Sequence, residues 1–292
     1  MTGIQGGVRR NAVITGATGG IGRWIALGLA DAGFRLFVIG RNPAALAATR
    51  GWIGGRLPGA EVETILADLS LLSDTRAAAA AVLSRVDRLA LLVNNAGTLS
   101  PRRVTTAEGH ERTLAVNHLA PFVLTRGLLP ALRRDAAASR DARIIDVGSS
   151  TSDRARIDPD DLELVRHWGM VRAYSSSKLA LLMTSLALAR QLQGSGIGVN
   201  VVHPGTVATR LVRDPGVVGL AWKLMAPFVL SERQGADTPL HAALSSDCEG
   251  LSGSYLKRRR PARPNPLALD RALCRRVLVA TEALAAHPAA DG

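Results

Sequence analysis

The sequence is poor in aromatic residues and in long apolar runs. Trp, Tyr and Phe make up 3% of its 292 residues, although hydrophobic residues as a whole make up 47%. A chain with this apolar content is not a disordered protein, and its core has to be built from Ala, Val, Leu and Ile. No uninterrupted apolar run reaches the length of a membrane-spanning helix, so we expect no stable insertion into a bilayer.

Cysteine is also scarce, and the start of the chain has no apolar signal core. Cys248 and Cys274 lack the spacing of a metal site, and we interpret them as reduced thiols. Residues 1–9 are rich in glycine, and we expect them to be flexible. Together these features favour a cytoplasmic protein without a metal site.

Lysine is rare although the chain is strongly basic. The formal net charge is +12, and only three of the 36 basic residues are lysines. A basic chain can bind nucleic acid or an anionic membrane. Here the arginines are scattered, and a GC-rich genome would produce the same bias toward Arg and Ala. The one dense run, from Lys257 to Arg260, lies in a Pro-rich stretch that is typical of a solvated loop. We therefore expect no nucleic-acid partner.

Short apolar runs alternate with segments of helical periodicity along most of the chain. Strands are expected at residues 11–15, 34–39, 62–66, 89–93, 143–147 and 198–202, and helices at residues 21–32, from 43, 72–85, 108–134, 173–193, 237–245 and 267–286. Apolar strands that alternate with helices form a parallel sheet covered on both faces. The sequence predicts one α/β Rossmann domain over residues 1–292, doubly wound, with ligands beyond the carboxyl ends of its strands.

A glycine-rich segment joins the first expected strand to the first helix. It runs from Thr15 to Gly22, where Gly16 allows a tight turn and Gly20 lets the backbone approach a pyrophosphate. Gly22 permits close packing of the helix, whose first N–H groups attract phosphates. Because the segment lies inside a βαβ unit, the context that this motif requires, we predict nucleotide binding.

The second expected strand ends at an arginine. Folds that bind NAD place an Asp or Glu about 20 residues beyond the glycines, where it binds a ribose hydroxyl. Arg41 occupies that place, and its guanidinium could hold a 2′-phosphate, with a contribution from Arg23. The alternative is that both are ordinary surface arginines. We predict NADP(H) as the preferred cofactor, with NAD(H) as the alternative.

The next two strand ends also face the predicted cofactor. Asp68 could bind the adenine, although an ordinary helix-capping Asp is the competing interpretation. The fourth strand ends in Asn94-Asn95-Ala96-Gly97, whose small residues let the backbone pass close to a ribose. The predicted cofactor residues along these segments are Gly16, Thr18, Gly20, Ile21, Gly22, Arg23, Arg41, Asp68, Leu69, Asn95, Ala96 and Gly97.

Tyr174 and Lys178 stand four residues apart at the start of the second long helix, and therefore on one helical face. A free tyrosine has a pKa of about 10 and is a poor acid at neutral pH. A nearby ammonium would stabilise the phenolate and lower this pKa into a useful range. With only two tyrosines and three lysines in the chain, such a pair is rare by chance. We predict a proton-transfer pair.

Two polar residues complete the predicted site. Ser149 follows the fifth strand, where its hydroxyl could donate to a substrate oxygen as negative charge grows there. Ser150 is the competing candidate. Asn117 lies inside the first long helix, where asparagine has no reason of propensity to stand, and it could bind a water.

These segments resemble the short-chain dehydrogenase/reductase superfamily. The matching pieces are Thr15–Gly22, Asn94–Gly97, Tyr174–Lys178 and the Pro204-Gly205 turn, in order over residues 10–260. The amino-acid sequences of Val116–Phe122 and of the segments around Tyr174 and His203 are most similar to the retinol dehydrogenase-like branch.

The resemblance implies a nicotinamide-dependent enzyme that interconverts an alcohol and a carbonyl. It implies a catalytic tetrad of Asn117, Ser149, Tyr174 and Lys178. Tyr174 would exchange the proton, Ser149 would polarise the carbonyl, and Lys178 would bind the nicotinamide ribose and lower the pKa of Tyr174. Asn117 would hold a water of a proton relay. Pro204, Gly205, Val207 and Thr209 would line the nicotinamide.

Two segments depart from the superfamily pattern. Gly148 stands where many members have a serine, and the stretch from Ser149 to Tyr174 is long. Its residues 153–168 would either rim the substrate mouth or form a surface excursion. The site residues nevertheless favour an enzyme over the alternative of an NADP-binding sensor without turnover.

The resemblance also gives expectations for the substrate and for assembly. A substrate lid over residues 205–235 has an apolar stretch at 217–225, which favours a lipophilic carbonyl or alcohol. An amphipathic helix packed on the core, or a peripheral membrane contact, is the alternative for this stretch. A homodimer through the two long helices is a further expectation. A basic loop and a C-terminal helix are expected over residues 257–292.

Overall fold

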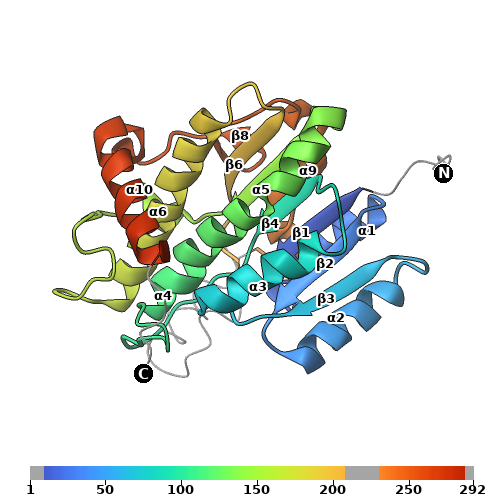
Figure 1. Ribbon diagram of the computed structural model, residues 1–292, viewed down its shortest axis with the longest axis horizontal. Coiled ribbons are helices and arrows are strands. Elements are labelled where there is room, and N and C mark those ends of the chain that lie inside the picture. Colours follow the sequence, from blue (N-terminus) through green and yellow to red (C-terminus); the bar gives the residue numbers. More distant parts are fainter. Residues whose placement is uncertain (1–9, 208–229, 287–292) are drawn as a thin grey trace.

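The structure is a computed structural model that describes residues 10–207 and 230–286. Within these residues eight strands form one sheet, in the order β3-β2-β1-β4-β5-β6-β7-β8 (Figure 1). The strands are β1 (Asn11–Thr15), β2 (Arg35–Gly40), β3 (Val62–Leu66), β4 (Leu91–Asn94), β5 (Ala142–Val147), β6 (Ile197–His203), β7 (Ser254–Lys257) and β8 (Arg260–Pro261). Strands β1 to β7 are parallel, and β8 runs antiparallel to β7. The strand order reverses between β1 and β4, the switch point at which such sheets bind ligands.

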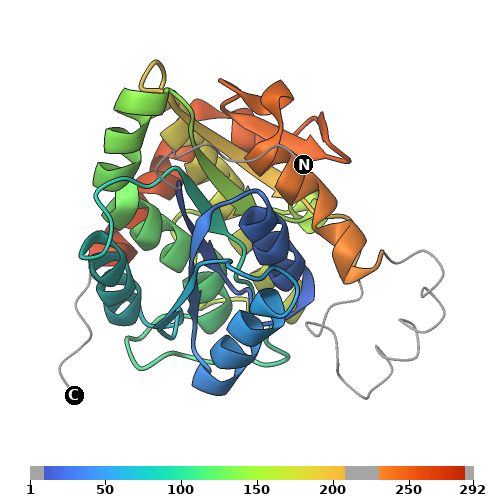
Figure 2. The same cartoon turned by 90° about the vertical axis from the view of Figure 1, so that its right-hand side faces the viewer.

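Helices cover both faces of the sheet. One layer contains α1 (Gly20–Asp31), α2 (Pro43–Gly54) and α9 (Asp237–Leu244), and the other contains α3 (Leu72–Leu83), α5 (Ala120–Ser139) and α6 (Met170–Gln191). Figure 2 shows α1 and α9 on one side of the sheet, with α3 and α5 on the other. Helix α10 (Arg271–Ala286) packs on α6 at the end of the sheet opposite to α2 (Figure 1). The predicted doubly wound α/β domain is confirmed.

The central strands are apolar along their whole length because both of their faces are covered. Ile14 and Val93 belong to the core under α1, whereas Val13, Phe37 and Leu92 belong to the core under α3 and α5. Val13 lies opposite Phe37 on one side and Leu92 on the other. This alternation explains why the sequence shows continuous apolar runs instead of a two-residue period.

The helix expected over residues 108–134 is built from three pieces. It begins as α4 (Arg112–Leu114), continues as the π-helical segment η1 (Ala115–Leu119), and becomes α5, which reaches Ser139. A π-segment widens the helix by one residue and often marks a functional site. Side-chain periodicity does not report such an insertion, so the sequence predicted one regular helix.

The basic run at Lys257–Arg260 is an exposed turn at Arg258 and Arg259, as expected of a solvated loop, but its two ends belong to strands. It forms the hairpin between β7 and β8, with φ values of 48° at Arg258 and 64° at Arg259. Lys257 forms an ion pair with Asp153. Strand β7 was missed because it has only four residues, of which two are buried. The C-terminal helix begins at Arg271, after a short 3-10 turn (Pro266–Leu269), instead of at residue 267.

No helix within residues 10–207 and 230–286 has both the length and the apolarity needed to cross a membrane. The same residues contain no cluster of three or more His, Cys, Asp or Glu side chains that could hold a metal. The predicted N-terminal segment 1–9 and most of the predicted lid lie outside the described residues.

Candidate active site

The glycine turn lies at the switch point, between the carboxyl ends of β1 and β4. Gly16 has a φ of 69°, and a Cβ there would come within 2.7 Å of the Cα of Ala96. A Cβ at Gly22 would lie 2.4 Å from the side-chain nitrogen of Asn95 and from the oxygen of Gly16. Asn95 in turn donates to the carbonyl oxygens of Thr15 (2.9 Å) and Gly16 (3.1 Å). The turn and the β4 end are thus locked together.

The start of α1 fits the pyrophosphate of a dinucleotide. Its N-cap residue, Gly19, makes no side-chain cap, and the first turn contains no acidic residue. A Cβ at Gly19 would meet no atom within 4 Å, so the turn presents open backbone there. Uncapped N–H groups and the helix dipole favour a bound phosphate. Gly20 takes a φ of 58°, which is why a glycine is needed at this point of the turn.

Arg41 follows the last residue of β2 and forms one long ion pair among the described residues. Its guanidinium is 3.9 Å from the carboxylate of Asp68, and the Arg41 side chain is 60% exposed. The methyl group of Thr18 lies beside Gly40, which places the glycine turn next to this strand end. Arg23 lies further along α1, with its guanidinium 5.2 Å from the ring centre of Trp52 and its Nε buried without a partner.

Asp68 and Leu69 follow β3. The carboxylate of Asp68 accepts from the N–H of Ser70 at 2.9 Å and therefore stabilises a turn. Asp68 does not cap α3, whose N-cap is Leu71 and whose first N–H groups donate to the distant carboxylate of Glu108. The capping alternative is therefore wrong. Leu69 is buried in the core. An adenine contact of Asp68 stays a prediction.

The turn after β6 reaches the start of α1. Gly205 has a φ of 88°, and Val207 pairs with Leu230 in an isolated bridge that closes the base of the predicted lid. A Cβ at Gly235 would lie within 2.6 Å of both Val207 and Ile21, so these side chains meet above α1. Pro204 is half-buried. Thr209 and the apolar stretch 217–225 lie outside the described residues.

Tyr174 and Ser149 meet at the carboxyl edge of β5. Burial raises the pKa of Tyr174 above its ordinary value, and a hydrogen bond with the Ser149 side chain opposes part of this rise. Ser149 also accepts from the Thr151 N–H, which holds it at the start of η2 (Ser150–Arg154). Ser150 is exposed, and its backbone N–H donates to Nδ1 of His203 at 3.2 Å. The geometry therefore favours Ser149 over Ser150.

Lys178 is buried beneath the same edge. Its ammonium donates to the carbonyl oxygen of Val147 at 2.8 Å. Burial lowers the pKa of Lys178 to about 8, and the charge of Asp146 raises it in part. The expectation that Lys178 lowers the pKa of Tyr174 is wrong for the protein chain by itself, because burial of the phenol dominates and the ammonium points to a main-chain oxygen.

Asn117 lies in η1 and is fully buried. Its side-chain oxygen accepts from the N–H of Thr98 at 2.7 Å, and its amide donates to the carbonyl of Thr98 and to the hydroxyl of Ser177. Both amide hydrogens are thus used, and only the oxygen retains capacity for a water. A Cβ on Gly97 would lie 3.5 Å from this oxygen and 3.6 Å from the Lys178 nitrogen. Asn117 and Lys178 therefore face the same space above Gly97.

Gly148 has a packing role. A Cβ there would lie 2.7 Å from Cγ1 of Val201 on β6, so the serine found in many relatives does not fit without a shift of this neighbour. The segment 153–168 is anchored rather than loose. Asn265 donates to the carbonyls of Ser152 and Ala155, and the Tyr255 hydroxyl donates to Asp153.

Sequence reasoning missed a buried polar network under the site. Asp146 of β5 accepts hydrogen bonds from Asn94 of β4 and Ser185 of α6, and Asn94 also donates to Thr125 of α5. An acidic residue inside an otherwise apolar strand was the available signal. The partners could not be found, because they lie on three other elements.

Comparisons with known proteins agree with this geometry. Residues 10–215 match the family model described as short chain dehydrogenase. The chain is 37% identical to retinol dehydrogenase 12 of Homo sapiens over 243 residues, which are 83% of this chain and 76% of the relative. It is 37% identical to polyprenol dehydrogenase of Mus musculus over 272 residues, 92% of this chain and 81% of the relative.

Solved structures show the same fold. The RhlG–NADP active-site complex of Pseudomonas aeruginosa has a TM-score of 0.69 at 31% identity, covering 85% of this chain and 93% of that one. A protein from Mycobacterium paratuberculosis has a TM-score of 0.75 at 27% identity, covering 96% and 94%. The chain therefore belongs to the short-chain dehydrogenase family, within its retinol dehydrogenase-like branch, and is a nicotinamide-dependent oxidoreductase of alcohol and carbonyl groups on small molecules.

Proposed function

We propose that this enzyme interconverts a carbonyl and an alcohol on a lipophilic small molecule, with NADP(H) preferred over NAD(H), in the cytoplasm. One observation carries the proposed chemistry: the hydroxyl groups of Tyr174 and Ser149 are hydrogen-bonded at the carboxyl edge of β5, with the Lys178 ammonium buried on the same face of α6. This edge adjoins the uncapped start of α1, where a dinucleotide fits.

The reduced nicotinamide, when bound, supplies a hydride to the carbonyl carbon. Tyr174 gives its hydroxyl proton to the carbonyl oxygen, so an alcohol forms and a phenolate remains to be reprotonated. Ser149 donates a hydrogen bond to the same oxygen while negative charge develops on it. In the protein chain by itself the phenol is a weak acid, because burial raises its pKa, so the positive charge of Lys178 would have to stabilise the phenolate when the cofactor is bound.

The other predicted residues position the cofactor and the backbone around it. Lys178 would hold the nicotinamide ribose through its ammonium, and Asn117 keeps the backbone at Thr98 in place through two hydrogen bonds. Gly97 leaves the space between these two polar groups open. In the oxidation direction each proton step is reversed, and Tyr174 accepts the hydroxyl proton of the alcohol.

The preference for NADP(H) rests on Arg41. The end of β2 carries this exposed arginine in place of the acidic residue that would bind a ribose hydroxyl. A guanidinium forms strong paired hydrogen bonds with a phosphate. Arg23, the residue after Gly22, brings a second guanidinium close to the glycine turn. RhlG, a relative at 31% identity, forms a complex with NADP, which supports the same preference.

The lipophilic substrate rests on the relatives. Retinol and polyprenol, the alcohols in the names of two relatives that are 37% identical, are both long and apolar. The cytoplasmic location is supported by the two free, buried thiols of Cys248 and Cys274.

The direct test is the oxidation of NADPH and NADH, followed optically, with retinal, aromatic aldehydes, ketosteroids and quinones. Tyr174→Phe should lower turnover by at least about a hundredfold while NADPH binding, measured by calorimetry, is retained. If the unmodified protein binds NADPH and reduces nothing in this panel, the sensor without turnover replaces the proposed function.

The cofactor preference has its own test. Arg41→Ala should lower kcat/KM for NADPH about tenfold or more, because a charged hydrogen bond is lost, and should leave NADH nearly unchanged. Arg88→Ala is the matched control, since both arginine side chains are 60% exposed and lie 3.9 Å from a carboxylate. Arg88 precedes β4 and therefore lies at the amino ends of the strands, away from the predicted cofactor site. Equal losses with both cofactors would contradict the proposed preference.

A further inference from the structure

A buried carboxylate lies behind the active-site lysine. Asp146 is 4% exposed and points from β5 toward the layer of α5 and α6. It immediately precedes Val147, whose carbonyl oxygen accepts from the Lys178 ammonium at 2.8 Å. The negative charge of Asp146 raises the pKa of Lys178. Burial raises the pKa of Asp146 itself, and the hydrogen bonds from Ser185 and Asn94 and the positive charge of Lys178 oppose this rise. A buried charge is costly unless it is paired, so this arrangement needs an explanation.

The hydrogen-bond partners of Asp146 are all donors. The amide of Asn94 donates to one carboxylate oxygen at 2.7 Å, and the hydroxyl of Ser185 donates to the other at 2.6 Å. The same hydroxyl is 2.6 Å from the carbonyl of Leu181, and one proton serves one acceptor at a time. Donation to Asp146 leaves the Leu181 carbonyl in the regular ladder of α6. This assignment fits an ionised carboxylate, which accepts hydrogen bonds but has none to give.

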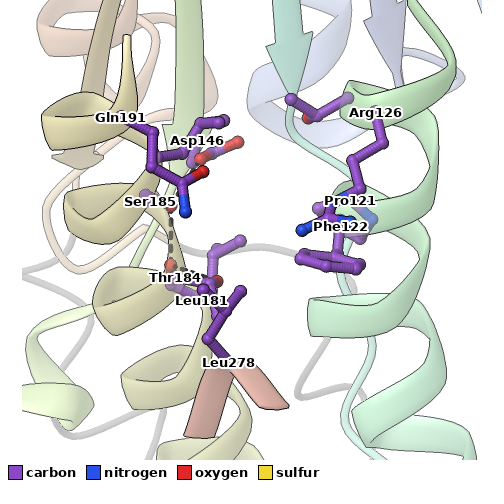
Figure 3. A pocket seen from close by; sticks show the side chains of 11 residues that line it. Pro121, Phe122, Arg126, Asp146, Leu181, Thr184, Ser185, Gln191 and Leu278 are labelled. Atoms are coloured by element: carbon purple, nitrogen blue, oxygen red, sulfur yellow. Dashed lines mark hydrogen bonds between the residues drawn. The ribbon is translucent and has the colours of Figure 1, made fainter. Parts of the chain in front are cut away.

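Ser185 and Lys178 are seven residues apart on α6, which is about two helical turns, so both face β5 from the same side of the helix. Figure 3 shows Asp146 and Ser185 together on the α6 side of a groove, with Arg126 and Phe122 of α5 across from them. The network thus connects β4, β5, α5 and α6 directly beneath the catalytic edge.

We propose that Asp146 is a positioning residue for Lys178: its buried carboxylate keeps the ammonium charged and directed to the Val147 carbonyl, ready for the cofactor ribose. The inference rests on the proposed role of Lys178 in the reaction. Asp146 does not touch the reacting atoms, so it acts through the lysine.

The charged and titratable groups around the pair are few. Tyr174 is on the same helix as Lys178, and Asn94 and Thr125 present neutral groups from β4 and α5. Arg126 of α5 lines the same groove, but it forms an ion pair with Glu282 of α10. Asp146 is therefore the anion that offsets the buried ammonium within the described part of the chain. Burial lowers the pKa of Lys178, so removal of the carboxylate leaves this effect unopposed.

The test is a direct titration of Lys178 in the intact protein. With ¹³C-labelled lysine the chain gives only three lysine signals, and Lys178→Arg identifies the one that matters. Asp146→Asn keeps the size of the side chain and removes its charge. We expect the Lys178 midpoint to move to lower pH by roughly one pH unit or more, with the alkaline loss of activity moving in step.

Asp135→Asn is the matched control. Asp135 is also a buried carboxylate that accepts a serine hydroxyl four residues on (Ser139, 2.9 Å), but it pairs with Arg10 at the amino edge of the sheet. It should leave the Lys178 midpoint unchanged. An unchanged midpoint in folded Asp146→Asn overturns the proposal, as does an equal shift in the control.

If Asp146→Asn fails to fold, Ser185→Ala serves as the test. Loss of the hydrogen bond from Ser185 makes the ionised form of Asp146 less stable. The midpoint must then move in the same direction by a smaller amount, and no movement overturns the proposal. The titration needs no turnover. A shifted midpoint in a protein that reduces no carbonyl would retain the Asp146–Lys178 pair and reject the proposed function. Full activity together with an unshifted midpoint would retain the proposed function and reject the role of Asp146.

Discussion

At the scale of single residues, two glycines of the site have opposite reasons to lack a side chain. A Cβ at Gly148 would come 2.7 Å from Val201, a stiff β-branched residue in the core. A Cβ at Gly97 would make only ordinary contacts, 3.5 Å and 3.6 Å from polar atoms of Asn117 and Lys178. The first glycine is required by packing and the second keeps a functional space open.

We predict that Gly148→Ala lowers the free energy of unfolding by about 1–3 kcal/mol, because the core next to Val201 is overfilled. Urea denaturation measures this loss. In a Val201→Ala background the same substitution should cost clearly less, because the methyl group then has room. Equal costs in both backgrounds would show that the contact with Val201 is not the cause.

Gly97→Ala should instead leave the stability nearly unchanged and lower kcat/KM for the carbonyl substrate about tenfold or more, since its methyl group fills the space between Asn117 and Lys178. Steady-state kinetics and thermal unfolding measure the two effects. Gly54→Ala in α2 is the control, because a Cβ there meets no atom within 4 Å. A large loss of stability in Gly97→Ala would contradict this assignment.

Lys178 gives a pH dependence with a defined sign. Its pKa of about 8 means that the ammonium is present below this pH and is lost above it. Carbonyl reduction should therefore fall as pH rises through about 8. Between about 8 and the ordinary value of 10.5 the folded protein binds fewer protons than the unfolded chain, so the contribution of Lys178 to stability increases with pH. Rate profiles and denaturation curves should thus move in opposite directions across this window.

At the scale of elements, the π-segment η1 is hydrogen-bonded to the C-terminal helix α10. His118, next to Asn117, is fully buried and its Nε2 is 2.8 Å from the hydroxyl of Thr281 on α10. Thr281 follows Asn117 by 164 residues in the chain. The sequence pattern therefore predicted both segments but not the contact between them. Helix α10 therefore supports the segment that carries a predicted tetrad residue.

The burial of His118 predicts sensitivity to acid. Burial lowers its pKa from 6.5 to about 3, so the folded protein keeps it neutral while the unfolded chain protonates it. Its contribution to stability is complete above pH 6.5 and is lost as pH falls toward 3. Relative to His118→Gln, the unmodified protein should lose up to about 1.4 kcal/mol more per pH unit in this window. Chemical denaturation at several pH values measures the difference, and parallel curves would contradict the prediction. His203, whose pKa is also lowered by burial, is present in both proteins.

At the scale of the whole molecule, α10 also bears on assembly. It packs on α6, and Arg126 of α5 forms an ion pair with its Glu282. A homodimer through the long helices stays a prediction, and an interface on this face has to include α10. Sedimentation analysis measures the mass. Glu282→Arg, which breaks the ion pair and repels Arg126, should weaken such a dimer, whereas a dimer that is indifferent to it uses another face.

The sequence by itself determined the order of the first six strands and of the helices between them, the glycine turn and the Tyr174–Lys178 pair. Each of these features depends on residues that are close together in the sequence, through hydrophobic periodicity, turn conformation or helical spacing. Gly16 and Gly20 need their positive φ wherever the turn stands, and a residue and its fourth neighbour share a helical face in any helix.

Only the tertiary structure decided which groups are buried and what they meet there. The distant Glu108 caps α3, β7 joins the sheet beside β6, and the charge of Asp146 acts on Lys178 while Asn94 of β4 and Ser185 of α6 donate to its carboxylate. It also decided the direction of the Tyr174 pKa, which the helical spacing with Lys178 predicted wrongly. The physical reason is that desolvation and charge act through space, and the sequence does not state the distances between elements far apart in the chain.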